Sequence, residues 1–120
     1  MKPTGPTNPD LKKLIGELRK MSHSEQADIW KRLANDLQKP SRQRRVVNLS
    51  RINRYSEEND TVVVPGKVLA AGTLDHRVNI AAFCFSGAAR ETILKNNGTA
   101  MSISELMKQN PNGKKIRIIG

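Results

Sequence analysis

The chain has little of several residue types on which metal proteins and secreted proteins depend. Its 120 residues contain one cysteine and two histidines. A single cysteine cannot form an intrachain disulfide, and these three residues cannot supply the four ligands of a Cys/His zinc cluster. The sequence therefore predicts a reduced, intracellular protein that holds no metal and no other cofactor.

Long hydrophobic runs are also missing. The longest uncharged apolar run, Ile80–Phe85, has six residues, whereas a membrane-spanning helix needs about 20. The first residues, Met1–Pro6, contain no apolar stretch of the kind found in a secretory signal. We therefore expect a cytoplasmic protein without a membrane partner.

Catalytic motifs are absent as well. The sequence has no G-x-G-x-x-G or G-x-S-x-G, and neither of its Gly-Lys pairs is followed by the Ser or Thr of a phosphate loop. Cys84 with His23 or His76 is the one candidate nucleophile pair. Cys84 stands between two phenylalanines, however, where a cysteine is usually packed and inert. We expect no enzyme and no small-molecule substrate.

What the chain has in excess is positive charge. Lys and Arg total 21 against 11 Asp and Glu, a net charge of +10, which indicates a polyanionic partner. Residues 39–54 hold six of these cations and no acidic residue. Because like charges repel, such a run favours a partner that neutralises it. Asn48 in the same run either reaches a base edge or 2′-hydroxyl or caps a helix. The run predicts nucleic-acid binding.

The scarcity of aromatic residues narrows the kind of nucleic acid. Single-strand platforms stack bases on several exposed aromatics, and this chain has one Trp, one Tyr and two Phe. We expect Trp30, Phe83 and Phe85 in the core. A helix-turn-helix reader is the second candidate, but no basic recognition helix follows the first two helices in the expected register. Structured RNA, bound through its phosphates, fits better.

Two short helices are predicted for the front of the chain. Residues 1–9 are proline-rich and indicate an extended arm, with Asn8 as helix cap and Pro9 at the first helical position. Ser22 and Glu25 have the spacing of a capping box and predict the start of the second helix. The apolar stripes of the two helices are Leu11, Leu14, Ile15 and Leu18, then Trp30, Leu33, Ala34 and Leu37.

The rest of the chain predicts strands mixed with helices, so the fold class is mixed α/β. Asn48 is expected to cap a short helix, and residues 61–64 to form a strand that ends at a Pro65-Gly66 turn. Ser86 and the pair Ser102 and Glu105 are expected to open two helices. Further elements are expected at residues 78–85 (strand), 88–95 (helix), 103–107 (helix), 110–113 (turn) and 116–119 (strand).

A family resemblance spans this order of elements. The segments that carry it are Lys39-Pro40, Val47–Ile52, Val62–Leu69, Asn8-Pro9, Phe85–Gly87 and Asn110–Gly113. The chain resembles the archaeal and eukaryotic large-subunit ribosomal protein L-eighteen-e family, which is related in fold to the bacterial-type L-fifteen proteins, and its short length is most like the archaeal form. The resemblance implies a compact domain over residues 10–120. Its expected parts are a helical front (10–38), a basic segment with an acidic turn (39–60) and a core of irregular strand-strand-helix turns (61–120).

The resemblance also implies a function. It indicates a structural constituent of the large ribosomal subunit that binds large-subunit ribosomal RNA and contacts neighbouring ribosomal proteins. A free-standing RNA- or DNA-binding regulator that uses the same basic segment is the alternative. The residues expected to contact RNA are Lys39, Arg42, Arg44, Arg45, Asn48, Arg51, Arg54 and Lys67.

Overall fold

A computed structural model describes residues 9–38 and 45–119, without the side chain of Arg45. Within these residues five helices and five strands follow one another, which confirms the α/β class predicted from the sequence. Their contacts divide them into two compact units. The helical unit comprises residues 9–38 with Met107–Lys114, and the sheet unit comprises Arg45–Leu106 with residues 115–119. The expected arm up to Asn8 lies outside the described residues.

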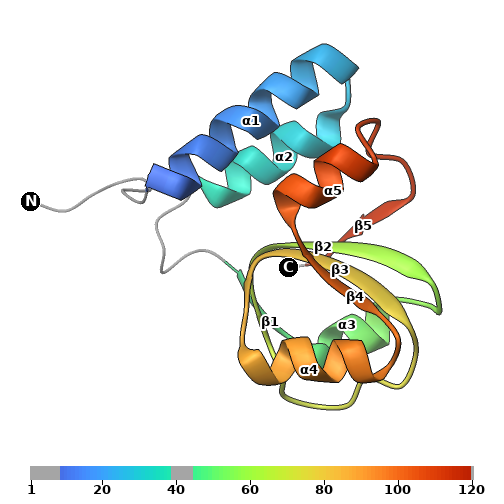
Figure 1. The fold of residues 1–120 in the computed structure, drawn as a ribbon. Coiled ribbons are helices and arrows are strands. Elements are labelled where there is room, and N and C mark those ends of the chain that lie inside the picture. The colour runs from blue at the N-terminus through green and yellow to red at the C-terminus, as the bar shows by residue number, and fades with distance from the viewer. Residues whose placement is uncertain (1–8, 39–44, 120) are drawn as a thin grey trace, which may run out of the picture. The chain divides into compact units, whose positions relative to one another are not determined.

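The helical unit contains α1 (Pro9–Glu25) and α2 (Asp28–Leu37). They run antiparallel, side by side (Figure 1), and every residue of the two predicted apolar stripes is buried. The indole Nε1 of Trp30 donates to the Pro111 carbonyl at 2.7 Å, which fixes the predicted turn at 110–113. Gly113 in that turn has φ +67°, and a Cβ there would lie 2.3 Å from Cγ2 of Ile29. Only glycine fits this position.

The boundary between the two helices differs from the prediction. α1 continues through Ser22 and Glu25, so these residues form its last turn and not a capping box for α2. Gln26 has φ +52°, and the Ala27 N–H donates to the Ser22 carbonyl at 3.1 Å. This left-handed residue with a 6→1 hydrogen bond is the Schellman arrangement that ends helices. The N-cap of α2, Ala27, makes no side-chain cap hydrogen bond.

A parallel sheet forms the centre of the second unit. Its strands are β1 (Arg45–Asn48), β2 (Asp60–Leu69), β3 (Val78–Phe85), β4 (Thr99–Ser102) and β5 (Ile116–Ile118). The order is β1-β2-β3-β4, and β5 also pairs with β2. β1 pairs with the second half of β2 and β5 with the first half, Thr61–Val63. Since β3 occupies the other edge of β2, β1 and β5 share one edge.

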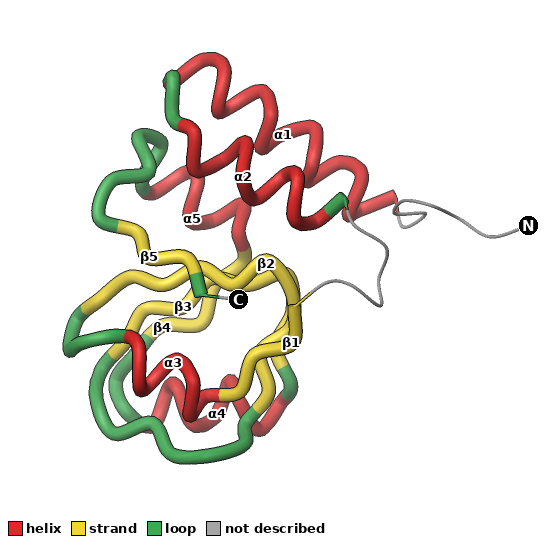
Figure 2. Tube along the Cα trace, turned by 180° about the vertical axis from the view of Figure 1, so that it is seen from behind, coloured by secondary structure: helices red, strands yellow, loops and turns green. Residues whose placement is uncertain are grey.

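Two helices, α3 (Leu49–Tyr55) and α4 (Gly87–Lys95), cover one face of the sheet (Figures 1 and 2). Their inward side chains join strand side chains in one core that includes Leu49, Ile52 and Ile93. α4 begins as predicted, because the Ser86 hydroxyl accepts from the Ala89 N–H at 3.1 Å.

The last helix, α5 (Ile103–Gln109), also begins as predicted. The Ser102 hydroxyl accepts from the Glu105 N–H at 3.1 Å, and the Glu105 carboxylate accepts from the Ser102 N–H at 3.0 Å. These two reciprocal hydrogen bonds confirm the capping box.

The prediction of a turn at Pro65-Gly66 is wrong. β2 runs through both residues, and only its register with β3 shifts, between Val64 and Lys67. A bulge of this kind adds a residue without ending the strand, and it changes the direction of the following side chains. The short strands β1 and β4 were not predicted.

Candidate nucleic-acid interface

Two arginines of the basic run, Arg51 and Arg54, lie on α3, and the backbone of a third, Arg45, begins β1. Leu49 and Ile52 are fully buried in the core. At 100° per residue, positions 51 and 54 therefore lie on the opposite side of the helix, and position 55 lies on its flank. Arg51 and Arg54 are exposed, as the pattern requires. Among the described residues, no carboxylate pairs with either guanidinium, so both are available to an external anion.

Asn48 connects β1 to α3. It is the N-cap residue of the helix, with an extended backbone (φ −87°, ψ 155°), but its side chain makes no cap hydrogen bond. The predicted helix start is confirmed, whereas the capping by the Asn48 amide is wrong. The residue is half-buried beside the exposed side of α3.

The loop between β2 and β3 holds α3 in place. The Ser50 N–H donates to the Ala71 carbonyl at 3.1 Å, and the Asp75 N–H donates to Oδ1 of Asn53 at 3.1 Å. Gly72 has φ +88°, and a Cβ there would lie 2.2 Å from the Cβ of Ser50. This close contact and the two hydrogen bonds fix the direction in which the helix presents its arginines.

A Ser-His-Asp series joins the end of α3 to the same loop. Oγ of Ser56 lies 2.9 Å from Nε2 of His76, whose Nδ1 lies 3.1 Å from Oδ1 of Asp75. The order is that of a nucleophile, a base and an acid. The Ser56 residue is buried, however, with 8% exposure, and its hydroxyl donates to the Ile52 carbonyl at 2.5 Å. The series therefore ties the loop to the end of α3.

Lys67 lies on the sheet rather than on α3. It pairs with Val46 of β1 and with Cys84 of β3, and all three residues are exposed. The expectation that Cys84 is packed is wrong. Cys84 shares a face of the sheet with the exposed Lys67, its partner in β2, and the pairing of β3 with β4 ends before it, at Ala82. Phe83 and Phe85, expected in the core, are half-buried.

The predicted contact residues thus fall into three groups. Arg51 and Arg54 are together on α3, and Asn48 is its N-cap residue. Lys67 is adjacent to β1, whose first residue, Arg45, has its backbone opposite Gly66. The other three, Lys39, Arg42 and Arg44, lie outside the described residues.

Sequence reasoning missed one cation at this surface. Arg117 of β5 lines a depression of about 280 Å³ together with Arg51 and Tyr55 of α3. Arg117 also pairs with Asp60 at 3.4 Å. Arg51 and Arg117 lie near opposite ends of the sheet unit in the sequence. The pairing of β5 with β2 brings them to one surface.

The part of the chain that the structure describes offers neither a metal site nor a membrane span. There, no three side chains of His, Cys, Asp or Glu are grouped as metal ligands. None of the helices described combines the length and apolarity needed to span a bilayer.

The fold and the charge distribution define a small, strongly basic α/β protein with an arginine-bearing helix. The chain belongs to the family described as ribosomal protein 60S L18 and 50S L18e, which matches residues 4–120. It is 50% identical to the large ribosomal subunit protein eL18 of Methanothermobacter thermautotrophicus, over 94% of this chain and 93% of that protein. The proteins of the same name from Methanoregula boonei and Sulfurisphaera tokodaii are 45% and 44% identical, over 94% and 97% of this chain and 93% and 95% of their own lengths. The family inferred from sequence is confirmed.

Proposed function

We propose that this protein is a structural constituent of the large ribosomal subunit and binds its large RNA. The observation that carries the proposal is family membership along nearly the whole chain, residues 4–120. Relatives that cover more than nine-tenths of this chain are named as large-subunit proteins. The net charge of +10 supports an RNA partner.

The RNA interface consists of the residues expected from the sequence: Lys39, Arg42, Arg44, Arg45, Asn48, Arg51, Arg54 and Lys67. Two exposed arginines on a helix anchored in the core support this assignment, since a guanidinium fork suits phosphate oxygens. Their role is to neutralise phosphates where RNA segments approach one another.

The proposed mechanism is scaffolding without turnover. The protein stays bound in the ribosome, in the cytoplasm, beside neighbouring large-subunit proteins, and it uses no cofactor, metal or small-molecule substrate. The burial of Ser56 argues against catalysis by the Ser56-His76-Asp75 series, because a nucleophile must reach its substrate.

The test is binding of the full chain to deproteinised large-subunit RNA, with small-subunit RNA as competitor, over a series of salt concentrations. If roughly six to ten phosphates are neutralised, the affinity should fall about 10³- to 10⁵-fold between 50 and 200 mM salt. Arg44→Glu combined with Arg45→Glu should abolish binding and incorporation into subunits. Equal affinity for the two RNAs would favour the alternative, a free-standing regulator, and normal incorporation of the double variant would refute the site assignment.

A further inference from the structure

A second feature of the sheet unit lies beside the RNA interface. The depression between α3 and β5 is lined by Arg51, Tyr55, Arg117, Ile118 and Ile119. Among the described residues, its lining thus combines two guanidinium groups, one aromatic ring and two isoleucines. Its volume of about 280 Å³ is just below the usual range of small-molecule sites, about 300–1,000 Å³. It suits one part of a larger ligand.

Tyr55 is the aromatic residue that is free to meet such a ligand. Of the four aromatic side chains in the sequence, Trp30 is buried, and Phe83 and Phe85 are half-buried. Tyr55 has 48% exposure, although α3 has a buried side available for an apolar ring. The Arg51 guanidinium carbon lies over the Tyr55 ring, 5.4 Å from its centre. Arg51 thus covers one face of the Tyr55 ring and leaves the other face uncovered. RNA bases stack on aromatic rings and on guanidinium planes.

Arg117 supplies the charge on the other side of the depression. Its guanidinium is held by Oδ2 of Asp60 at 3.4 Å, and that oxygen accepts from the Glu57 N–H at 2.8 Å. Asp60 therefore positions Arg117. The Arg117 side chain is 53% exposed, so this ion pair contributes little binding energy and leaves donors for another anion.

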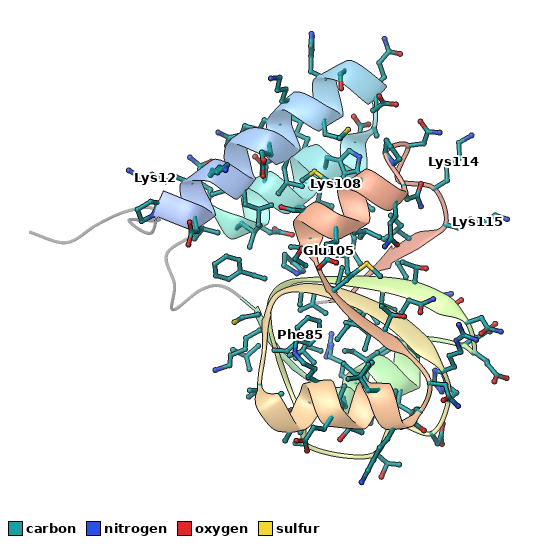
Figure 3. The ribbon with its side chains drawn as sticks, viewed as in Figure 1. Lys12, Phe85, Glu105, Lys108, Lys114 and Lys115 are labelled. Atoms are coloured by element: carbon teal, nitrogen blue, oxygen red, sulfur yellow. The ribbon has the colours of Figure 1, made fainter. Side chains whose placement is uncertain are left out.

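The cations continue beyond Arg117. A neighbouring depression of about 390 Å³ is lined by Asp60, Thr61, Lys115, Ile116 and Arg117. Lys115 points outward from the loop before β5 (Figure 3). Arg117 lines both depressions, so Arg51, Arg117 and Lys115 follow one another along the surface. A row of cations beside an aromatic ring matches a ligand in which phosphates repeat beside a base.

We infer that this depression binds one unpaired nucleotide of the RNA: its base stacks on Tyr55, and Arg117 binds its phosphate. The inference rests on the proposed function and adds a specific contact to it. Phosphate contacts by themselves carry no sequence information, whereas a splayed base marks a loop or a bulge. The site would therefore select where on the RNA the protein binds.

The test compares four variants of the full chain in binding to deproteinised large-subunit RNA. Tyr55→Leu should weaken binding roughly 5- to 150-fold, the loss typical of one base stack, whereas Tyr55→Phe should bind as the unchanged protein does. Neither should change the dependence of log K on log salt. Arg117→Gln should lower that slope by about 1. Arg77→Gln, an exposed arginine that lines neither depression, is the matched control.

Several results would overturn the inference. Unchanged affinity of Tyr55→Leu would exclude the base stack, and Arg117→Gln behaving like Arg77→Gln would exclude the phosphate contact. Normal RNA binding of Tyr55→Leu with poor entry into subunits would mean that a neighbouring protein fills the depression. These results leave the proposed function intact, whereas failure of the unchanged protein to prefer large-subunit RNA would refute that function instead.

A second measurement uses intact large subunits and does not depend on the folding of free RNA. After irradiation with ultraviolet light and digestion, the peptide that contains Tyr55 should carry the mass of a nucleotide. Recovery of that peptide only in unmodified form, while other peptides of the protein carry nucleotides, would contradict the stacking contact.

Discussion

The replacement of both α3 arginines tests the electrostatic part of the account. Arg51 and Arg54 lie outside the core on an anchored helix, and among the described residues neither pairs with a carboxylate. Each phosphate that a protein neutralises contributes about −0.9 to the slope of log K against log salt. If Arg51 and Arg54 each neutralise one phosphate, Arg51→Gln with Arg54→Gln removes two such contributions. The slope of log K against log salt should therefore become less steep by about 1.8.

The same relation gives the size of the loss. At 0.1 M salt two charges correspond to a factor of about 60 in affinity, and at 0.3 M salt to a factor of about 9. The fold should not suffer, because the exposed contact of Arg51 with Tyr55 is worth only about 0.5–1 kcal/mol. Thermal unfolding of the variant should therefore be close to that of the unchanged protein.

The assay is equilibrium binding to large-subunit RNA at both salt concentrations. Arg77→Gln with Lys95→Gln is the matched control, since it removes the same charge from exposed residues elsewhere in the sheet unit. The reasoning would be refuted if the control lost as much affinity as the α3 variant. It would also be refuted if the loss were the same at both salt concentrations, because then the lost contacts would not be electrostatic.

The remaining predictions concern packing and helix caps, measured by urea unfolding. Gly113→Ala should lower the free energy of unfolding by about 1–3 kcal/mol, because its Cβ would overlap a side chain of α2. Gly16→Ala, in open space on α1, should raise the free energy of unfolding by about 0.5–1 kcal/mol. If both variants lost stability, the contact of Gly113 with α2 would not be the cause of the loss. Ser86→Ala should lower the free energy of unfolding by about 1 kcal/mol, because the Ser86 hydroxyl caps α4. Asn48→Ala should lower it by less than about 0.5 kcal/mol, because the Asn48 side chain makes no cap hydrogen bond. Equal losses in the two variants would contradict this difference. Gly72→Ala should weaken RNA binding as well as stability, because it forces the loop away from α3, and normal RNA affinity would show that the loop does not position the arginines.

Local signals explain which elements the sequence predicted well. The stripe that begins at Leu11 and the hydroxyls of Ser86 and Ser102 act within one or two helical turns, so their spacing contains the information. The signal at Ser22 and Glu25 has the same spacing but was misleading. There, the left-handed backbone of Gln26 decides where α1 ends, and no neighbouring glycine marks that position.

Contacts between distant segments explain what the sequence could not predict. β1 and β4 have four residues each, too few for an alternating pattern, and they are strands because they pair with β2 and β3. The register shift between Val64 and Lys67 likewise depends on strand pairing, and so does the exposure of Cys84, which pairs with Lys67 beyond the end of β4.

The candidate site shows the same division. The basic run of residues 39–54 predicted Arg51 and Arg54 as RNA contacts from charge alone, since no acidic residue interrupts it. Arg117 stands between two isoleucines of a short strand, where an exposed cation is common, so its charge gave no signal of a binding site. Its place beside Tyr55 follows from the pairing of β5 with β2, a contact between residues more than fifty positions apart.

Attachment to the ribosome is the central claim, and sedimentation tests it most directly. Native cell extract is centrifuged through a sucrose gradient that contains high salt, and the protein is detected in each fraction. We expect recovery with the large subunit in stoichiometric amount, because folded RNA and neighbouring proteins would also hold the chain through packing and stacking contacts, which salt does not screen. Recovery at the top of the gradient, with the large subunit free of the protein, would contradict it.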